Sequence, residues 1–200
     1  RWCASFPWRD RSSPVQVGAL NNWRTVVCGG EFTLAIKTDG TLWAWGANYS
    51  GQLGIGTTTP SYISSPVQVG ALTDWTQITA SYFTAGAVRS NGTLWMWGRN
   101  QYGELGQGDV VHRSSPTQVG TLTDWKYVST LNQSFTVSAV KTDGTLWGWG
   151  RNWYGQLGVD DSIRRSSPVQ VGSLTDWEKV SNNNFFAAGL RTTIGTLIPT

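Results

Sequence analysis

One segment of about 52 residues recurs along this 200-residue chain, and this repeat constrains the fold more than any other feature of the sequence. The tripeptide Ser-Ser-Pro begins at residues 12, 64, 114 and 166. The tetrapeptide Trp-Gly-x-Asn begins at residues 45, 97 and 149, and Gly-x-Leu-Gly begins at residues 51, 103 and 155. Several motifs that recur in the same order at one spacing indicate a repeat architecture.

Counted from Ser-Ser-Pro, the chain divides into an N-terminal segment, three full repeats and one partial repeat. The ranges are 1–11 for the N-terminal segment, 12–63, 64–113 and 114–165 for the repeats, and 166–200 for the partial repeat. The partial repeat has no Trp-Gly-x-Asn. All of these ranges belong to one domain or to part of one.

Each repeat predicts several short β-strands. In the first repeat we expect strands at residues 15–17, 23–27, 32–36 and 42–45, where apolar and β-favouring residues gather. Asp39-Gly40 between the last two is a strong hairpin signal, because both residues accept positive φ. The glycine content is high (24 residues) and no helical apolar stripe is present, so we expect no helices.

A sheet unit of this size cannot bury both of its faces alone, so neighbouring copies must stack on it. Radially arranged four-stranded units make a β-propeller, in which only short edges remain exposed. The sequence therefore predicts an all-β propeller of four-stranded blades, with about four repeats in this chain. A linear β-solenoid has shorter repeats and fits less well.

The run Trp45-Gly46-Ala47-Asn48-Tyr49-Ser50-Gly51-Gln52-Leu53-Gly54, with the preceding Asp-Gly-Thr-Leu-Trp, resembles the RCC1 repeat (regulator of chromosome condensation type). The resemblance implies a propeller with seven four-stranded blades. It covers roughly residues 12–198. The family usually has Gly-x-x-His-Thr before the buried strand, whereas here phenylalanine stands at the histidine place, as at Phe32, Phe83 and Phe135. We expect aromatic or apolar packing to replace the polar contacts of that histidine.

The number of repeats is short of seven, and three arrangements account for this. The chain belongs to a longer propeller, or two copies form one ring, or residues 1–11 supply the missing strand of a four-bladed ring. We favour the first.

The paired tryptophans of each repeat are expected to pack between blades, because they recur at equivalent places. They are Trp43, Trp45, Trp95, Trp97, Trp147 and Trp149. The alternative is that they form carbohydrate-stacking platforms.

The sequence offers no catalytic constellation, metal-ligand spacing or phosphate-binding loop, so we predict no enzyme activity, no metal and no cofactor. His112 is the only histidine and falls in a variable stretch. The net charge is +3, and the cations are spread along the chain, which disfavours nucleic acid as a partner. For Cys3 and Cys28 we expect free thiols rather than a disulfide. No apolar run is long enough to span a membrane.

Recognition in a propeller is expected in loops that vary between repeats. The variable stretches contain aromatic, apolar and cationic candidates for partner contacts, namely Tyr62, Ile63, His112, Arg113, Trp153, Arg164 and Arg165. The sequence therefore predicts a non-enzymatic scaffold that binds a protein partner or self-associates. The low charge and the tryptophan-dense repeats resemble bacterial and phage-borne RCC1-like proteins, and this resemblance implies a role in a phage virion or on a bacterial cell surface. The alternatives are a glycan-binding propeller and a guanine-nucleotide exchange or regulatory domain.

Overall fold

The computed structural model describes residues 21–130, 135–182 and 187–191, together with residues 13, 16, 17 and 19. Within this part of the chain every regular element is a β-strand, which confirms the all-β prediction. The strands form three four-stranded antiparallel sheets and one two-stranded sheet. None of the described residues forms an apolar helix of membrane-spanning length.

Each sheet pairs its strands in chain order, so each is a blade made from one continuous segment. The first blade contains β1 (Trp23–Cys28), β2 (Phe32–Lys37), β3 (Leu42–Ala47) and β4 (Tyr62–Gln68). The second contains β5 (Trp75–Ala80), β6 (Thr84–Arg89), β7 (Leu94–Gly98) and β8 (Arg113–Gln118). The third contains β9 (Trp125–Thr130), β10 (Thr136–Lys141), β11 (Leu146–Gly150) and β12 (Arg165–Gln170). The two-stranded sheet consists of β13 (Trp177–Asn182) and β14 (Ala187–Arg191).

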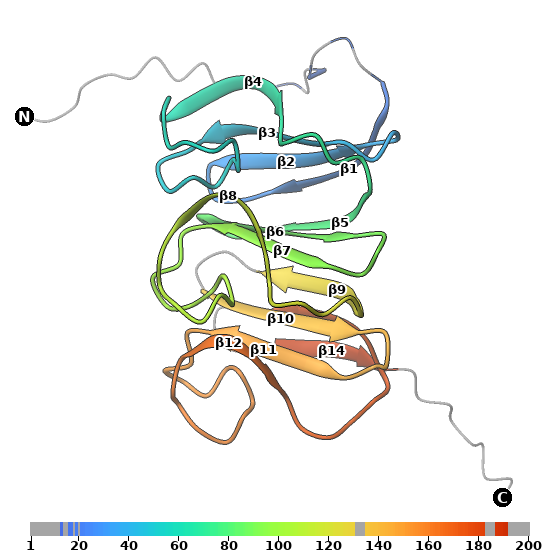
Figure 1. Ribbon diagram of the computed structural model, residues 1–200, viewed down its shortest axis with the longest axis vertical. Coiled ribbons are helices and arrows are strands. Elements are labelled where there is room, and N and C mark those ends of the chain that lie inside the picture. Colours follow the sequence, from blue (N-terminus) through green and yellow to red (C-terminus); the bar gives the residue numbers. More distant parts are fainter. Residues whose placement is uncertain are drawn as a thin grey trace, which may run out of the picture.

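Neighbouring blades stack face to face. The first strand of each blade contacts the first and second strands of the preceding blade. The blades therefore follow one another from top to bottom of Figure 1, with short hairpin turns at the right and long loops at the left. We call these two edges of the stack the turn end and the loop end, and we call the contact between two blades a seam.

The blades are offset from the repeats counted in the sequence. Ser-Ser-Pro lies within β4, β8 and β12, so it belongs to the fourth strand of a blade rather than to its start. At Gln16 and Val17 the backbone forms no strand, and both residues are exposed. The N-terminal segment 1–11, the proposed source of a closing strand, lies outside the described residues, as does Cys3; Cys28 is exposed and unbonded.

The second tryptophan of the second and third pairs lies in a seam. The Trp97 indole nitrogen donates to the Gln52 carbonyl of the preceding blade at 3.0 Å, and Trp149 donates to the Glu104 carbonyl at 2.9 Å. Both side chains are 0% exposed. Trp45 belongs to the first blade and is half-buried.

The first tryptophan of each pair belongs to a repeated unit near the turn end. Its ring makes a T-shaped contact with the tryptophan at the start of the first strand of the same blade. Its indole nitrogen donates to a threonine hydroxyl, and a cation lies over its ring. The three rings are Trp43 with Lys37, Trp95 with Arg89 and Trp147 with Lys141.

The Asp-Gly and Asn-Gly turns bring successive blades into close contact. In these turns only the glycine takes positive φ, which differs from our expectation for both residues; φ is +76° at Gly92. The Asp39 carboxylate instead accepts from the Thr41 amide and hydroxyl. A Cβ on Gly92 would lie 1.9 Å from the Thr123 carbonyl oxygen at the start of the next blade. Glycine is therefore required here for both its φ and its small size.

The sequence Leu-Thr-Asp-Trp begins at residues 72, 122 and 174, and each of its aspartates forms an ion pair within its own blade. Asp74 pairs with Arg89 at 2.8 Å, Asp124 with Lys141 at 3.4 Å, and Asp176 with Arg191. Each pair joins the residue just before the first strand of a blade to the last residue of its second strand. The basic partner lies 15 or 17 residues away in the sequence, so a local motif does not reveal it.

Candidate functional site

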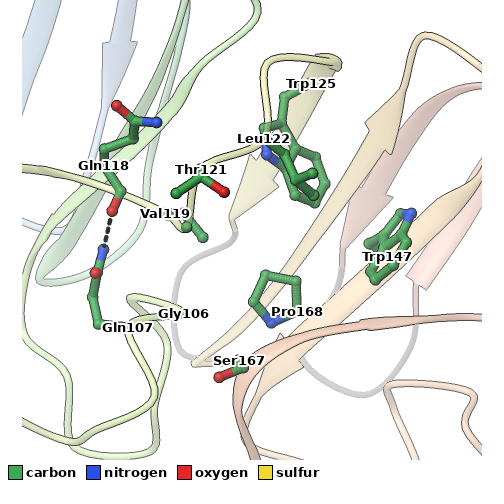
Figure 2. Close-up of a pocket in the computed structure, with 11 residues that line it drawn as sticks. Gly106, Gln107, Gln118, Val119, Thr121, Leu122, Trp125, Trp147, Ser167 and Pro168 are labelled. Atoms are coloured by element: carbon green, nitrogen blue, oxygen red, sulfur yellow. Dashed lines mark hydrogen bonds between the residues drawn. The ribbon is translucent and has the colours of Figure 1, made fainter.

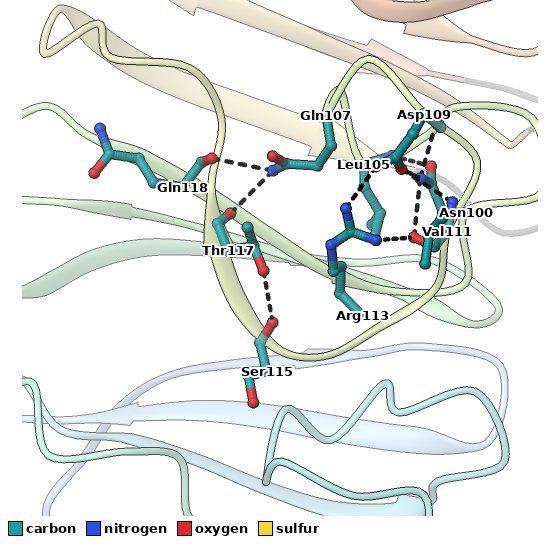
Figure 3. Close-up of polar contacts among 9 residues, drawn as sticks. All are labelled: Asn100, Leu105, Gln107, Asp109, Val111, Arg113, Ser115, Thr117 and Gln118. Atoms are coloured by element: carbon teal, nitrogen blue, oxygen red, sulfur yellow. Dashed lines mark hydrogen bonds and ion pairs between the residues drawn. The ribbon is translucent and has the colours of Figure 1, made fainter.

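The loop end carries all the partner-contact residues that the sequence analysis selected. Each long loop follows the third strand of its blade and is held by the asparagine of Trp-Gly-x-Asn. Asn100 is 0% exposed; it accepts from the Leu105 amide at 2.9 Å and donates to the Asp109 and Val111 carbonyls. This buried residue thus holds the loop of the second blade to the end of β7 (Figure 3).

Arg113 and Arg165 bind aspartates of their own loops. Arg113 pairs with Asp109 at 2.6 Å and donates to the Val111 carbonyl, as Figure 3 shows. Arg165 pairs with Asp161 in the same way. The pKa of each aspartate is lowered, first by a backbone amide that donates to it and then by the arginine. These two arginines shape the loops, and their charge is neutralised.

His112 is a hydrogen-bond acceptor in the structure. Its Nδ1 accepts from the Asn100 amide at 3.1 Å. Partial burial and the nearby Arg99 lower the pKa of its imidazole, so the neutral ring is favoured. Arg164 is exposed and lines a shallow groove with Val110 and Val111 of the preceding blade's loop.

Tyr62 and Ile63 lie on the first blade, apart from the candidates on the third. Tyr62 is 53% exposed and meets the ring of Tyr49 edge to face, with centroids 5.0 Å apart. Ile63 is half-buried and packs against the core of the first seam. Tyr62 therefore remains a candidate contact, while Ile63 is chiefly a packing residue.

Trp153 lies in an array of aromatic rings and arginines at the seam between the second and third blades. Its side chain is 54% exposed, and its ring lies 5.4 Å from that of Tyr102 in the preceding blade. The Arg151 guanidinium lies 3.9 Å from the Trp153 ring centroid and 5.8 Å from that of Tyr102. The same guanidinium lies 5.7 Å from the ring centroid of Tyr154, which is 66% exposed.

Arg99 continues this array toward the second blade. Its guanidinium lies 5.5 Å from the Phe83 ring and 5.1 Å from the Phe135 ring, one from each blade. Phe135 in turn lies 5.2 Å from Tyr102. We call Phe83, Arg99, Tyr102, Phe135, Arg151 and Trp153 the arginine–aromatic array.

The array depends on residues that differ between blades. The amide of Arg99 donates to the Phe83 carbonyl and that of Arg151 to the Phe135 carbonyl, whereas in the first blade the corresponding bond joins Ala47 to Glu31. The first blade thus has neither the arginine nor the aromatic ring. Phe32 is not equivalent to Phe83, because it lies within β2, pairs with Gly46 of β3 and is buried; in the second blade Thr84 holds the corresponding pairing with Gly98.

Sequence analysis missed both arginines. Each occupies the x of Trp-Gly-x-Asn, a variable position inside a motif that was interpreted only as framework. The signal that could have found them is the change from Ala47 to Arg99 and Arg151 at one place in the repeat.

Neither arginine of the array has a carboxylate partner among the residues that the structure describes. Arg99 donates to the side-chain oxygen of Gln101. The Nε of Arg151 is buried and has no acceptor within the same residues. A buried donor without an acceptor costs about 1–3 kcal/mol, and because Nε is covered, only the terminal N–H groups of this half-buried side chain can reach a ligand.

Glu104 lies two residues after Tyr102 in the same loop and is 1% exposed. Burial raises the pKa of its carboxyl, against the effect of the Tyr102 and Gln101 amides that donate to it. The other blades have Gln52 and Gln156 at this place, and each accepts a backbone amide in the same way.

A groove of about 470 Å³ lies in the same seam, away from the array (Figure 2). Trp147, Leu122 and Pro168 form apolar parts of its lining, and no charged side chain lines it. The Gln107 amide nitrogen bonds to the carbonyls of Thr117 and Gln118, which leaves its oxygen as an acceptor.

Two models of the same repeat match this chain. Residues 39–88, 91–130 and 143–188 match the regulator of chromosome condensation (RCC1) repeat, and residues 23–52 and 75–104 match a second model with that description. The chain belongs to the RCC1 repeat family. Within the described residues no three His, Cys, Asp or Glu side chains lie together as a metal site would require.

RCC1 repeat proteins with curated functions are similar to this chain over most of its length. The ultraviolet-B receptor UVR8 of Arabidopsis thaliana is 33% identical over 188 residues, which are 92% of this chain and 42% of UVR8. The mitochondrial RCC1 domain-containing protein RUG3 of the same plant is 33% identical over 82% of this chain and 38% of its own length. The chain thus spans less than half the length of these relatives.

Solved RCC1-type structures share the fold. Prp20p from Saccharomyces cerevisiae, whose binding to Gsp1p and histones is described with its structure, matches with a TM-score of 0.75 at 18% identity. The match covers 88% of this chain and 45% of Prp20p. Human WBSCR16 matches with a TM-score of 0.72 at 19% identity, over 85% of this chain and 45% of its own. The predicted propeller fold is confirmed by these neighbours.

Proposed function

We propose that this chain is a non-enzymatic protein-binding scaffold whose loop end contacts the partner. The arginine–aromatic array carries this proposal, because tryptophan, tyrosine and arginine are the side chains that most often dominate binding energy at protein interfaces. The array is built from the second and third blades, whereas in the first blade Ala47 and Glu31 replace its arginine and aromatic ring. A feature that serves only to stack blades would also be present in the first blade.

The relatives support a role in protein binding. Prp20p is described as binding Gsp1p and histones, and yeast RCC1 (Prp20) has been solved with Kap60 bound to it. These partners belong to those proteins; for this chain they support the class of function and leave the partner to be found.

A random peptide display library selected on the purified protein tests the proposal. We expect peptides to be enriched on the wild type and lost on Trp153→Ala, because the exposed indole supplies apolar contact area. The control is Leu174→Ala, which removes an apolar side chain of similar exposure (44%) from the turn end. Enrichment that is unchanged in Trp153→Ala but lost in Leu174→Ala would place binding elsewhere and refute the proposal.

The groove beside Trp147 favours one second function, glycan binding. An indole edge together with uncharged amide and hydroxyl groups suits a neutral sugar, which offers both a hydrogen-bonding rim and an apolar face. A glycan array separates the two functions: saturable hits that Gln118→Ala abolishes would support a lectin, and an array without hits would remove this alternative.

A further inference from the structure

We infer that the arginine–aromatic array selects an acidic protein segment, with carboxylates bound by Arg99 and Arg151 and an apolar side chain beside Trp153. This inference rests on the proposed function and names the chemistry of the partner. It follows from the state of the two guanidinium groups and from the charge of the surrounding loops.

The array holds its arginines in place without neutralising them. Arg151 lies against Trp153 at 3.9 Å, and Arg99 lies between Phe83 and Phe135. A guanidinium that stacks on a ring keeps the N–H groups in its plane available, and these match the two oxygens of a carboxylate. Because aromatic contacts already restrict the side chains, little rotamer entropy remains to be lost on binding.

Two other arginines near the same loops are neutralised, in contrast to those of the array. Arg113 and Arg165 begin β8 and β12, and each is paired with an aspartate four residues earlier. The buried carboxyl of Glu104 accepts the Gln101 and Tyr102 amides, and within the described residues it forms no ion pair with Arg99 or Arg151. The array is therefore a local site of unpaired positive charge in a chain whose net charge is only +3.

The same charge distribution favours a protein segment over nucleic acid. A phosphate backbone requires a row of cations along its path, because each phosphate contact adds to affinity. Here the next cations on the third-blade loop are Arg164, which neighbours Asp160 and Asp161 in the loop, and Arg165, which is neutralised. Two unpaired arginines beside an exposed tryptophan instead suit a short segment that alternates acidic and apolar residues.

The test uses fluorescence anisotropy of a labelled peptide in which glutamate alternates with leucine and serine, together with a peptide that has glutamine at every glutamate. We expect the glutamate peptide to bind at least about tenfold more tightly, which corresponds to about 1.4 kcal/mol. Affinity should fall between about 50 and about 300 mM salt, as expected for partly exposed charges.

Arg99→Gln with Arg151→Gln should weaken binding of the glutamate peptide about tenfold or more. The matched control is Arg164→Gln, which removes an exposed loop-end charge outside the array and should change affinity less than about twofold. Equal binding of both peptides, an effect of Arg164→Gln as large as that of the double variant, or tighter binding of single-stranded oligothymidine would each overturn the inference. If Trp153→Ala still abolished binding of library peptides in those cases, the proposed function would stand without the acidic preference.

Discussion

Replacing Gly92 by alanine measures how much the contact at the turn end contributes to the stacking of blades. Its Cβ would meet the Thr123 carbonyl oxygen at 1.9 Å, so that oxygen must move by about 1 Å to reach the shortest separation that real contacts show. Trp125, which is 2% exposed, donates its amide to the Gly92 carbonyl at 3.0 Å, and this bond would be disturbed by the shift.

Gly120→Ala is the matched control, because Gly120 also has positive φ (+59°) but has nothing within 4 Å of its added Cβ. Left-handed backbone costs an alanine about 1–2 kcal/mol, partly offset by the stiffer unfolded chain, so we expect about 1 kcal/mol for the control. For Gly92→Ala we expect at least about 3 kcal/mol, since a hydrogen bond and part of the Trp125 packing are also lost.

Thermal and denaturant unfolding followed by tryptophan fluorescence would provide both free energies. A difference of about 2 kcal/mol corresponds to a melting temperature about 4–8 °C lower for Gly92→Ala than for Gly120→Ala in a chain of this size. Equal destabilisation by the two substitutions would show that the turns do not hold the blades together, and the reasoning would be refuted.

Three further substitutions test other parts of the account. A raised pKa means that the folded state holds the Glu104 proton more tightly than the unfolded state does, so stability is lost as pH rises from about 4.5 through the raised pKa. Glu104→Gln should therefore gain stability relative to wild type as pH rises toward 7. A difference in unfolding free energy that stays constant across pH would contradict this. Trp149→Phe should destabilise the protein by about 2–4 kcal/mol in urea unfolding, because the buried Glu104 carbonyl loses its donor and a void remains; a loss below about 1 kcal/mol would argue against a tight seam. Gln118→Ala should abolish any glycan binding in the groove. Gln68 is the equivalent residue of the first blade, and Gln68→Ala should leave that binding intact. The reverse pattern on a glycan array would place the sugar elsewhere.

The strands were predictable because their signal is local. Alternating small and apolar residues at 32–36 and the Asp39-Gly40 turn identify β2, the hairpin and β3 without knowledge of any partner. The residue at which each blade begins was harder to predict. Ser-Ser-Pro is the clearest repeat landmark, but it lies in the fourth strand, and no local property distinguishes a fourth strand from a first.

The site was harder to predict because it forms between blades. Arg99 meets Phe135 only because consecutive blades stack face to face, which brings residues 36 positions apart in sequence into contact. The spacing of the motifs gives the number of repeats in the chain but not how the loops of two blades face one another. Trp153 could be selected from the sequence because it lies in a variable stretch, where Tyr49 and Gln101 stand at its place in the other repeats. Its contacts with Arg151 and Tyr102 required the three-dimensional arrangement.

Hydroxyl-radical footprinting of the protein with bound acidic peptide tests most directly whether partners bind at the loop end. The account predicts that peptide protects Trp153 and Tyr154, which are 54% and 66% exposed, while Leu72 and Leu174 at the turn end keep their reactivity. Protection of the two leucines with unchanged oxidation of Trp153 would contradict it.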